Sequence, residues 1–538
     1  MKQTRKEFLD FLGKSTVVTA VSGTVFASFI ESCKTTQTVK GPSIPTVLFD
    51  GIPLQAIDSV VLAKGFNQQL LIKFGDAISL KDTFGTHNDY LAFIPLNKSG
   101  SEGILWSNHE YLDPILMGTS AINGKKTKEN VDKERYVVGG SLVHLKKTNK
   151  KWEVVQNSQY NRRLNGLTEI PFHWDEPIAG SNKAIGTFSN CAGGVTPWGT
   201  ILTCEENTDM MYGENVYDLN TGLVKMRKPS EYLWEQHYNF PPEHYGWVVE
   251  VNPKTGEAKK LVALGNCAHE CATVHQLPDG RVAIYTGDDG NDRCLYKFVS
   301  SKPNDLKNGT LYVANIEKGE WISVDYNTQP LLKKYFKNQT EVLVRLREAA
   351  PLIGGSLLNR PEDIEIDPFT GHVFISLTNN KPKGDYHGSI LKLEEADKGD
   401  TRFTSQVYKA GGPETGFSSP DNLAFDKNGN LWFTTDVSGY ALGKEKYHFF
   451  PCNTLSVIPR SGIRAGEVIR VACAPYNAEF TGPFFHPDGK TLFLSVQHPG
   501  EESPSLDKLI SHWPEGGQSL PKSSVICISG ESLEGLTL

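Results

Sequence analysis

Residues 269–289 read HECATVHQLPDGRVAIYTGDD. Two short runs rich in apolar and β-branched residues, 274–277 and 282–285, flank the tripeptide Pro278-Asp279-Gly280. Glycine accepts a positive φ without steric cost, so the tripeptide favours a tight turn between two strands. The two ends of a hairpin lie side by side, opposite its turn. The pattern therefore predicts that His269-Glu270 lies close to Asp288-Asp289, with metal-ligand side chains at both ends.

Five further hairpins of the same kind follow from the sequence, each with ligand-type side chains at its open end. Their entering and leaving ends are Asn88-Asp89 and Asn108-His109-Glu110, Asn190-Cys191 and Cys204-Glu205-Glu206, Arg360-Pro361-Glu362-Asp363 and Asn379-Asn380, Asp421-Asn422 and Asp436, and Glu479 and Gln497-His498. Six units of one polarity indicate a closed repeat structure with ligands converging on one face. Hairpins without such clusters alternate with them and complete four-stranded sheets. We therefore predict an all-β fold, a six-bladed β-propeller with long loop insertions and minor helices.

Segments outside these hairpins carry weaker signals. Residues 59–64 and 69–74 are strand-like and precede the first hairpin, so we expect them to close the ring against the last blade. Residues 156–186 and 208–245 have little strand pattern and are interpreted as loops over the mouth. Residues 330–350 place apolar side chains at helical spacing and are the best helix candidate.

The composition excludes some classes of function. A net charge of −7 over 538 residues offers no basic patch, so we expect no nucleic-acid partner. The nine cysteines are odd in number and widely spread. Cys267 and Cys271 lack a second pair at zinc-finger spacing, which disfavours a structural zinc site. We expect most cysteines to be buried free thiols and the protein to be a monomer.

The N-terminus is typical of an exported protein. Residues 1–33 are interpreted as an export signal, because basic residues precede a mostly apolar stretch. Residues 5–9, RKEFL, are similar to the twin-arginine motif with lysine in place of the second arginine. Residues 30–33 are similar to a lipobox, which would make Cys33 a lipid anchor. An uncleaved N-terminal membrane anchor is the alternative.

The rest of the chain divides into two parts. Residues 34–56 are rich in Thr, Pro and Gly and are interpreted as a linker. Residues 57–538 form a single propeller domain. We expect the mature protein in the periplasm, or at the cell surface as an outer-membrane lipoprotein.

The open ends of the six hairpins present one acidic residue from each blade. These residues are Glu110, Glu205, Glu270, Glu362, Asp421 and Glu479. Carboxylate and amide oxygens are the ligands that calcium requires. Six anions converging on one axis would repel one another strongly without cations. The pattern therefore predicts several bound metal ions.

Two residues suggest which chemistry these metals serve. A Cys191 thiolate among oxygen ligands indicates a transition metal, iron before zinc, although Cys191 also fits a small core residue before Ala192. Arg360 lies two residues before Glu362 and suits bidentate anion binding, although a structural Arg–Glu pair is the alternative. Metal ions and arginine on one anion indicate phosphate ester chemistry.

Six strings of the sequence carry a family resemblance. They are WSNHEYL (106–112), SNCAGGVTPWGTILTCEEN (189–207), YTGDDGNDRCLYKFV (285–299), RPEDIEI (360–366), SSPDNLAFDKNGNLWFTTD (418–436) and EFTGPFFHPDGKTLFLSVQHPGE (479–501). From about residue 60 onward the chain resembles the PhoX-type alkaline phosphatases. The resemblance implies an exported six-bladed propeller that hydrolyses phosphomonoesters and serves phosphate acquisition. It also implies an active site of paired ferric ions and calcium ions joined by an oxo group.

The resemblance implies roles for individual residues. Cys191 would be the thiolate ligand of iron, Glu270 and Glu362 would hold metal at the catalytic centre, and Arg360 would bind the phosphate. The remaining calcium or iron ligands would be Glu110, Asn190, Glu205, Asp421 and Glu479.

Two functions of other kinds stay open at this stage. A calcium-dependent lactonase or esterase of propeller type needs one calcium ion and leaves Cys191 without a role. A non-catalytic surface propeller would use calcium only to stiffen its loops. Iron together with several calcium ions would favour the phosphatase.

Overall fold

The computed structural model describes residues 49–537, which form antiparallel sheets. The predicted export signal (1–33) and residues 34–48 of the predicted linker lie outside these described residues. Residues 49–56 contain no strand, but the Phe49 side chain is buried in a core cluster. Within the described residues, no helix has both the length and the apolar character needed to cross a membrane.

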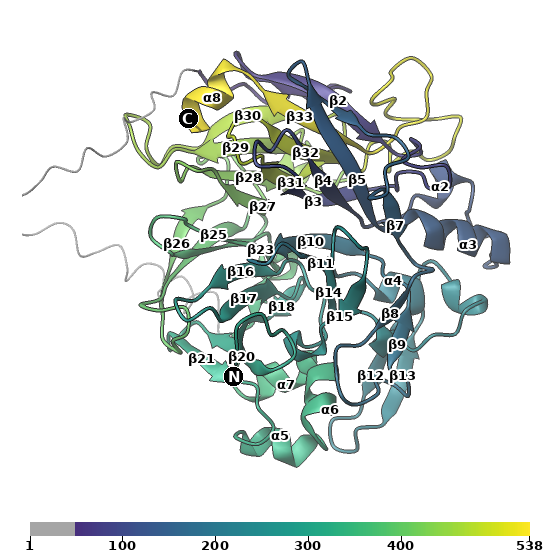
Figure 1. Ribbon diagram of the computed structural model, residues 1–538, viewed down its shortest axis with the longest axis vertical. Coiled ribbons are helices and arrows are strands. Elements are labelled where there is room, and N and C mark those ends of the chain that lie inside the picture. The colour runs from purple at the N-terminus through teal and green to yellow at the C-terminus, as the bar shows by residue number, and fades with distance from the viewer. Residues whose placement is uncertain (1–48, 538) are drawn as a thin grey trace, which may run out of the picture. The chain divides into compact units, whose positions relative to one another are not determined.

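Six sheets form the blades of a β-propeller, which confirms the predicted fold class (Figure 1). Blade 1 contains β3 (Asn88–Pro95), β4 (Glu102–His109), β5 (Gly139–Thr148) and β6 (Lys151–Val154), with β7 (Arg162–Leu164) also paired to β5; blade 2 contains β10 (Asn190–Val195), β11 (Ile201–Glu205), β14 (Val248–Val251) and β15 (Ala258–Lys260); blade 3 contains β16 (Thr273–Gln276), β17 (Val282–Gly287), β19 (Leu295–Ser300), β20 (Gly309–Asn315) and β21 (Glu320–Ser323). Blade 4 contains β23 (Pro361–Ile366), β24 (Val373–Leu377), β25 (Ser389–Glu394) and β26 (Thr404–Ala410); blade 5 contains β27 (Pro420–Phe425), β28 (Leu431–Thr435), β29 (Thr454–Ile458), β30 (Ile469–Cys473) and β1 (Val61–Leu62); blade 6 contains β31 (Glu479–Phe485), β32 (Leu492–Gln497), β33 (Ser524–Ser529) and β2 (Asn67–Lys73).

The ring is closed by its innermost strands and by the N-terminal strand. Each of β3, β10, β16, β23, β27 and β31 packs on the corresponding strand of both neighbouring blades. Strand β2 pairs with β33 from Asn67–Ser529 to Lys73–Ser524, as predicted for residues 69–74 (purple beside yellow in Figure 1). Strand β1 pairs with β30 of blade 5, not with the last blade. Because blade 6 takes strands from both ends of the chain, opening the ring there requires breaking the β2–β33 pairing.

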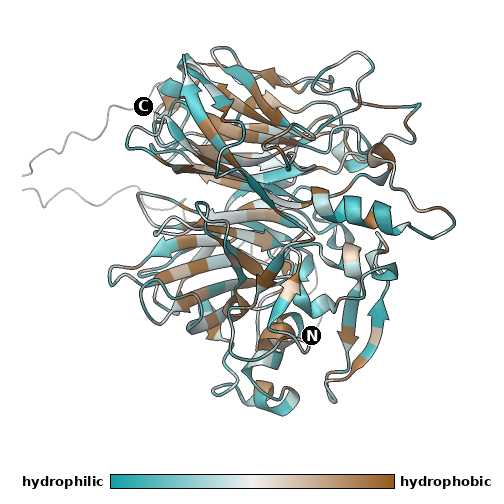
Figure 2. Ribbon diagram, turned by 45° about the vertical axis from the view of Figure 1, so that its right-hand side comes forward, coloured by the Kyte–Doolittle hydropathy of each residue, from teal (hydrophilic) through white to brown (hydrophobic). Residues whose placement is uncertain are grey.

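The hydrophobic core is divided among the six interfaces between blades. One example is the interface of blades 6 and 1, where Phe93 and Phe493 stack with ring centroids 5.7 Å apart. Between blades 1 and 2, Trp106 is fully buried against Val249 and Val251. Figure 2 shows apolar and polar residues alternating along many strands. Burying a side chain such as Phe93 contributes roughly 1.5–3 kcal/mol. Each blade is thus stabilised mainly by its two neighbours.

Helices lie in the connections between strands, except α8, which follows the last strand. The predicted helix at 330–350 is present as three short helices, α5 (Pro330–Tyr335), α6 (Gln339–Val344) and α7 (Leu346–Leu352). The helix α3 (Lys128–Val137) was not predicted, because it is mostly charged. Its first turn is capped by the Thr127 side chain, which accepts a hydrogen bond from the Asn130 N–H at 3.1 Å. The other helices are α2 (Pro114–Met117), α4 (Asp209–Tyr212) and α8 (Glu531–Thr537).

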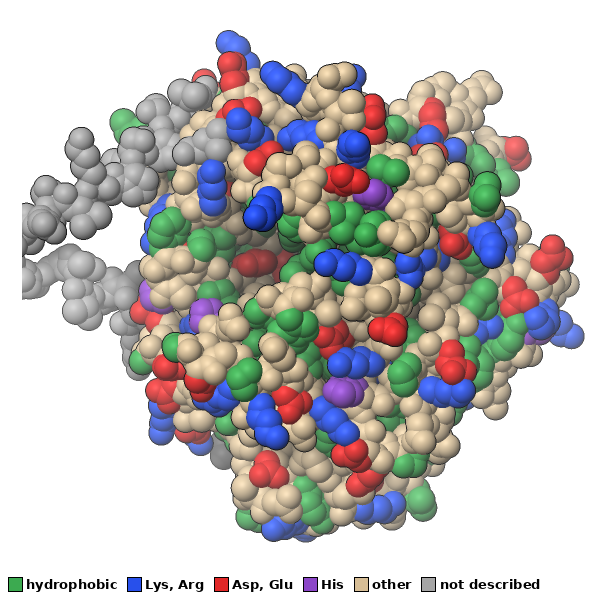
Figure 3. Space-filling model, in the orientation of Figure 1, with side chains coloured by type: hydrophobic (Ala, Val, Ile, Leu, Met, Phe, Trp, Pro, Cys, Tyr) green, Lys and Arg blue, Asp and Glu red, His purple; other side chains and the backbone are tan. Residues whose placement is uncertain are grey.

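The segments predicted as mouth loops contain short ribbons. Strands β8 (Glu169–Pro171) and β9 (Lys183–Ile185) pair with each other, as do β12 (Glu214–Tyr217) and β13 (Val224–Lys228). Outside these two segments, a further ribbon joins β18 (Asn291–Arg293) to β22 (Leu358–Asn359). The side chains of Tyr212, Trp234 and Tyr245 from the second segment are buried in the largest core cluster. This packing makes the insertions part of the domain core. The face drawn in Figure 3 carries basic and acidic side chains interspersed.

Candidate metal centre

The open ends of the six inner hairpins meet at one cavity of about 430 Å³. Its lining includes side chains from all six blades, together with residues of the connections that follow β28 and β32. Its charged or metal-ligating residues are Asp89, Glu110, Cys191, Glu206, Glu270, Asp289, Arg360, Glu362, Asp421, Asp436, Glu479, His498, Glu501 and Glu502. Eleven of these are carboxylates, and Arg360 is the only arginine or lysine that lines the cavity within the part of the chain that the structure describes.

Bulges at the start of the inner strands aim four of these side chains. In blade 1, Asn88 pairs with His109 and the next paired residue is Leu91, so Asp89 lies in the irregular step. The same shift occurs at the start of β10, β23 and β27. The residues that it displaces toward the cavity are Asp89, Cys191, Glu362 and Asp421. A bulge bends the strand locally and redirects a side chain, which is a common device beside functional sites.

A second repeated feature precedes these ligand-type residues. Two positions before Asp89, Cys191, Glu362, Asp421 and Glu479, the backbone is left-handed at a residue other than glycine. These residues are His87, Ser189, Arg360, Ser419 and Asn477, with φ between 41° and 56°. Such conformations cost about 1 kcal/mol or more each and tend to occur at functional sites. Their repetition in five blades indicates that the fold maintains the same turn around the cavity.

The leaving strands contribute a matching set. Each inner hairpin ends in a closing pair, such as Asn88–His109, Asn190–Glu205 or His269–Asp288. In five of the six blades, all but blade 4, the residue after the leaving member of the pair lines the cavity, which places Glu110, Glu206 and Asp289 there. Asp436 and His498 hold the same place in blades 5 and 6.

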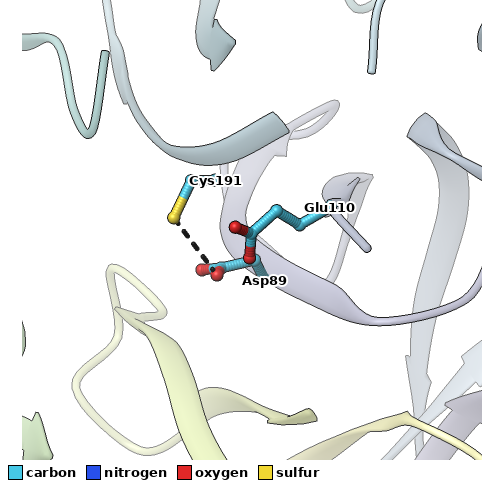
Figure 4. A group of neighbouring side chains, drawn as sticks. All are labelled: Asp89, Glu110 and Cys191. Atoms are coloured by element: carbon cyan, nitrogen blue, oxygen red, sulfur yellow. Dashed lines mark hydrogen bonds between the residues drawn. The ribbon is translucent and has the colours of Figure 1, made fainter. Parts of the chain in front are cut away.

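Three groups of side chains bring their ligand atoms within 4.8 Å of one another. They are Asp89 with Glu110 and Cys191, Cys191 with Glu206 and Glu270, and Glu270 with Glu362 and Asp421. Figure 4 shows the first group, in which the three side chains point toward one another. Cys191 and Glu270 each belong to two groups. The groups therefore form a continuous path of candidate ligands across the cavity.

The charges of this cavity are not balanced by protein cations. Burial raises the pKa of Asp89, Glu206, Glu270, Glu362 and Asp421 well above the ordinary carboxyl value, and neighbouring carboxylates add to the effect. Burial, with nearby Asp89 and Glu110, also raises the pKa of the Cys191 thiol well above its usual value. Bound cations would reverse these shifts by stabilising the ionised groups.

The donor set fits metal ions. Oδ1 of Asp89 is buried and accepts no hydrogen bond from any described residue. Cys191 Sγ lies 3.1 Å from Glu270 Oε1 and 3.5 Å from Asp89 Oδ2. A buried thiol and carboxylates at these separations suit a transition metal beside oxygen-bound cations. The residues present therefore could hold several ions.

Arg360 is held at the cavity wall by three carboxylates. Its Nε lies 2.9 Å from Asp289 Oδ1, one terminal nitrogen lies 2.6 Å from Glu362 Oε1, and the other lies 3.5 Å from Asp436 Oδ2. Burial opposes its charge, but these acids raise the pKa of Arg360 well above its usual value. Burial likewise opposes ionisation of Asp289, yet Arg360 holds the pKa of Asp289 below its usual value. The guanidinium is therefore a fixed positive charge.

His498 adds a second candidate cation on the blade 6 side. Its ring nitrogens lie 3.3 Å from Glu479 Oε1 and 3.2 Å from Glu501 Oε2. Burial acts against the imidazolium, but Glu501 and Glu479 raise the pKa of His498 well above its usual value. The same ring lies 3.0 Å from Nδ1 of His87, whose pKa burial lowers to about 3. His87 therefore stays neutral and leaves the charge on His498.

Most of the predicted site residues meet in the cavity. Cys191, Glu270, Arg360, Glu362, Glu110, Asp421 and Glu479 all line it. Two predicted ligands lie elsewhere. Glu205 is buried in an ion pair with Lys260, at 2.5 Å, and Asn190 hydrogen bonds with Thr187 and Thr203. These partners hold both side chains outside the cavity, whose lining includes neither residue.

Sequence reasoning did not select several lining residues. They are Asp89, Glu206, Asp289, Asp436 and His498. Aligning the six hairpins on their closing pairs would have found them, because each directly follows a member of such a pair in the chain. Residues 156–186 and 208–245, predicted as loops over the mouth, contribute no residue to the cavity lining. Residues 438–440 and 501–502 line the cavity instead. They belong to the connections that follow β28 and β32, two strands that end at the cavity.

A known protein family and a solved structure resemble this chain over most of its length. The family model described as alkaline phosphatase PhoX matches residues 47–500. PhoX of Pseudomonas fluorescens, solved in complex with vanadate, a transition state analogue, is similar over 91% of this chain and 99% of that chain, with 28% sequence identity and a TM-score of 0.80. A protein of unknown function from Dyadobacter fermentans matches 87% of this chain and 100% of its own, with 11% identity and a TM-score of 0.38. No curated protein matches the chain in sequence.

Proposed function

This chain belongs to the PhoX alkaline phosphatase family and is a phosphatase, and we propose that the acidic cavity is its catalytic centre for phosphomonoesters. The observation that carries the proposal is the position of Arg360. It is a fixed cation in a cavity otherwise lined by candidate metal ligands. Metal ions and arginine acting on one phosphoryl group are a recurring arrangement in phosphate ester hydrolysis. The vanadate complex of the Pseudomonas fluorescens protein supports the same reading.

The centre would hold iron and calcium. Cys191, with the carboxylates of Glu206 and Glu270, would hold Fe³⁺, because a thiolate prefers the softer ion. Of the three groups, the one made only of carboxylates, Glu270 with Glu362 and Asp421, would hold Ca²⁺. When bound, the ions would supply Lewis acidity toward phosphoryl oxygens and activate water. The shared positions of Cys191 and Glu270 support a multinuclear centre over separate sites.

Arg360 would bind the phosphate oxygens and neutralise charge that develops on them. Its guanidinium is positioned by Asp289, whose carboxylate accepts hydrogen bonds from the Nε–H and from one terminal N–H of Arg360. Glu362 belongs both to the Arg360 ion pairs and to a ligand group. Were Glu362 to serve as a ligand, its charge would be balanced by the bound cation, and a terminal N–H of Arg360 would be available to donate to a phosphate oxygen. The positioned guanidinium contributes most where the cavity excludes bulk water.

The cellular setting is part of the same proposal. An export signal over residues 1–33 would deliver the protein to the periplasm, or to the outer membrane through lipid at Cys33. A phosphatase there would release inorganic phosphate from esters outside the cytoplasm, in phosphate acquisition. We also propose that it acts as a monomer.

The test is turnover together with metal content. Purified protein supplied with calcium should hydrolyse p-nitrophenyl phosphate and contain iron and several calcium ions per chain. Chelation should abolish turnover, and restoring calcium and iron should recover it. A protein that contains one calcium ion and no iron, and does not release phosphate, would contradict the proposal.

A further inference from the structure

The mouth of the cavity has a different character from its interior. Tyr440 lines the cavity and is 58% exposed, so its ring is open to solvent. The backbone around it is held in place, because Val437 and Leu442 pack with Tyr447 in a small buried cluster. The Tyr440 carbonyl also accepts a hydrogen bond from Lys444 Nζ at 2.7 Å. The ring is therefore an exposed aromatic surface on a fixed support.

Lys381 lies against the same ring. Its Nζ is 5.6 Å from the ring centroids of both Tyr440 and Tyr447 and 3.4 Å from the Tyr440 hydroxyl oxygen. Lys381 begins the turn η4 (Lys381–Lys383), which the Asn380 side chain caps. Among residues 49–537 no carboxylate lies within ion-pair distance of Lys381, in contrast to Lys383, which pairs with Asp292. Its charge is thus not neutralised by a carboxylate of the described residues, and it lies beside a ring, that of Tyr440, which lines the cavity.

The mouth is also asymmetric in charge. Glu501 and Glu502 are exposed residues of the lining and come from the connection after β32. Tyr440 comes from the connection after β28, and Lys381, whose Nζ contacts its ring, comes from the connection after β24. A leaving group that carries negative charge is repelled by the acidic part and attracted to Lys381.

We propose that Tyr440 and Lys381 form the leaving-group subsite and give the enzyme a preference for phosphomonoesters of aromatic alcohols, above all those with an anionic substituent. The proposal rests on the proposed function, because a phosphate bound at Arg360 directs the rest of the ester toward the mouth. A planar leaving group can stack on the exposed ring of Tyr440. An anionic substituent on that group is attracted to the positive charge of Lys381. An aliphatic leaving group gains neither contact.

The experiment compares three esters with the metal-loaded enzyme: phenyl phosphate, 4-carboxyphenyl phosphate and glycerol 3-phosphate. Tyr440→Ala should lower kcat/KM for phenyl phosphate roughly fivefold more than for glycerol 3-phosphate. The loss should appear in KM, since stacking is equal in the ground and transition states. Tyr440→Phe should retain the preference. Lys381→Gln should raise KM for 4-carboxyphenyl phosphate more than for phenyl phosphate.

Two controls match these variants. Phe449→Ala removes another exposed ring of the same connection, and Lys383→Gln removes a lysine that already has a partner. Neither should change the ratios between esters. Equal losses for aromatic and aliphatic esters in Tyr440→Ala, or no loss at all, would overturn the subsite.

A binding measurement separates this inference from the proposed function. Wild-type protein that hydrolyses none of the three esters would contradict the function. Binding of phenylphosphonate and methylphosphonate can still be compared by calorimetry, because neither compound needs turnover. Tyr440→Ala should weaken phenylphosphonate selectively. Equal affinities of the wild-type protein for both phosphonates would overturn the subsite whether or not the protein is active.

Discussion

The thiol sulfur of Cys191 lies 3.1 Å from Oε1 of Glu270, although the two residues come from adjacent blades and are 79 positions apart. Both residues belong to two of the three ligand groups in the cavity. The pair therefore joins the groups into one centre. Substitution of either residue should affect more than one bound ion.

Cys191→Ser should remove iron and lower phosphatase activity by about 100-fold or more, because the thiolate is the one soft donor of the cavity. Metal analysis and visible absorption would measure the loss of iron and of any thiolate-to-iron band. Cys267→Ala is the matched control, since Cys267 is buried outside the cavity. A Cys191→Ser protein with full iron content would exclude the thiolate as an iron ligand.

Glu205 and Glu206 should behave in opposite ways. Glu205→Gln leaves the fully buried Lys260 without a carboxylate and should lower the free energy of unfolding by about 3–5 kcal/mol. Glu206→Gln removes one of several like charges, so metal-free protein should keep its stability while metal affinity falls. Denaturant unfolding in chelator and metal titration measure the two effects. The assignment would be reversed if Glu205→Gln lost metal and kept its stability.

Arg360→Lys should retain its metal ions and lower kcat/KM by about 100-fold or more. Lysine keeps the positive charge beside Asp289 and Glu362 but cannot donate two parallel hydrogen bonds to a phosphate. Inhibition by inorganic phosphate and vanadate should weaken in parallel. Unchanged inhibition constants would place phosphate binding elsewhere in the cavity.

The stability of the metal-free protein should fall as pH rises from about 5 to 9. Burial, together with the charge of Asp436, raises the pKa of Glu479 from 4.5 to about 8. A carboxyl whose pKa is raised in the folded state stabilises that state while protonated, and this contribution is lost as pH rises through the folded pKa. Asp89, Glu206, Glu270, Glu362 and Asp421 act in the same direction.

Thermal unfolding in chelator and in excess calcium measures this effect. The melting temperature should fall by several degrees across that pH range in chelator, and calcium should remove most of the fall. Glu479→Gln should flatten the pH dependence of the metal-free protein. A melting temperature that rises with pH in chelator would show that the cavity carboxylates are not held in the protonated form.

The secondary structure followed the sequence pattern where local rules apply. The turn at Pro278-Asp279-Gly280 joins β16 and β17, and the strand at residues 69–74 closes the ring. The helix α3 was not predicted, because few of its side chains are apolar. Its burial depends on contacts with distant segments. The insertions 156–186 and 208–245 were placed over the mouth from their composition alone. Composition does not determine on which part of the propeller surface an insertion packs.

The sequence by itself determined the six-fold repeat, the polarity of the hairpins and the residue types that converge, including Cys191, Glu270, Arg360 and Glu362. Only the tertiary structure decided which of two adjacent acids lines the cavity, as Glu206 does and Glu205 does not. The physical reason is the two-residue period of a strand, in which neighbouring side chains point to opposite faces. One bulge shifts that period by a residue, and its position depends on pairing between strands.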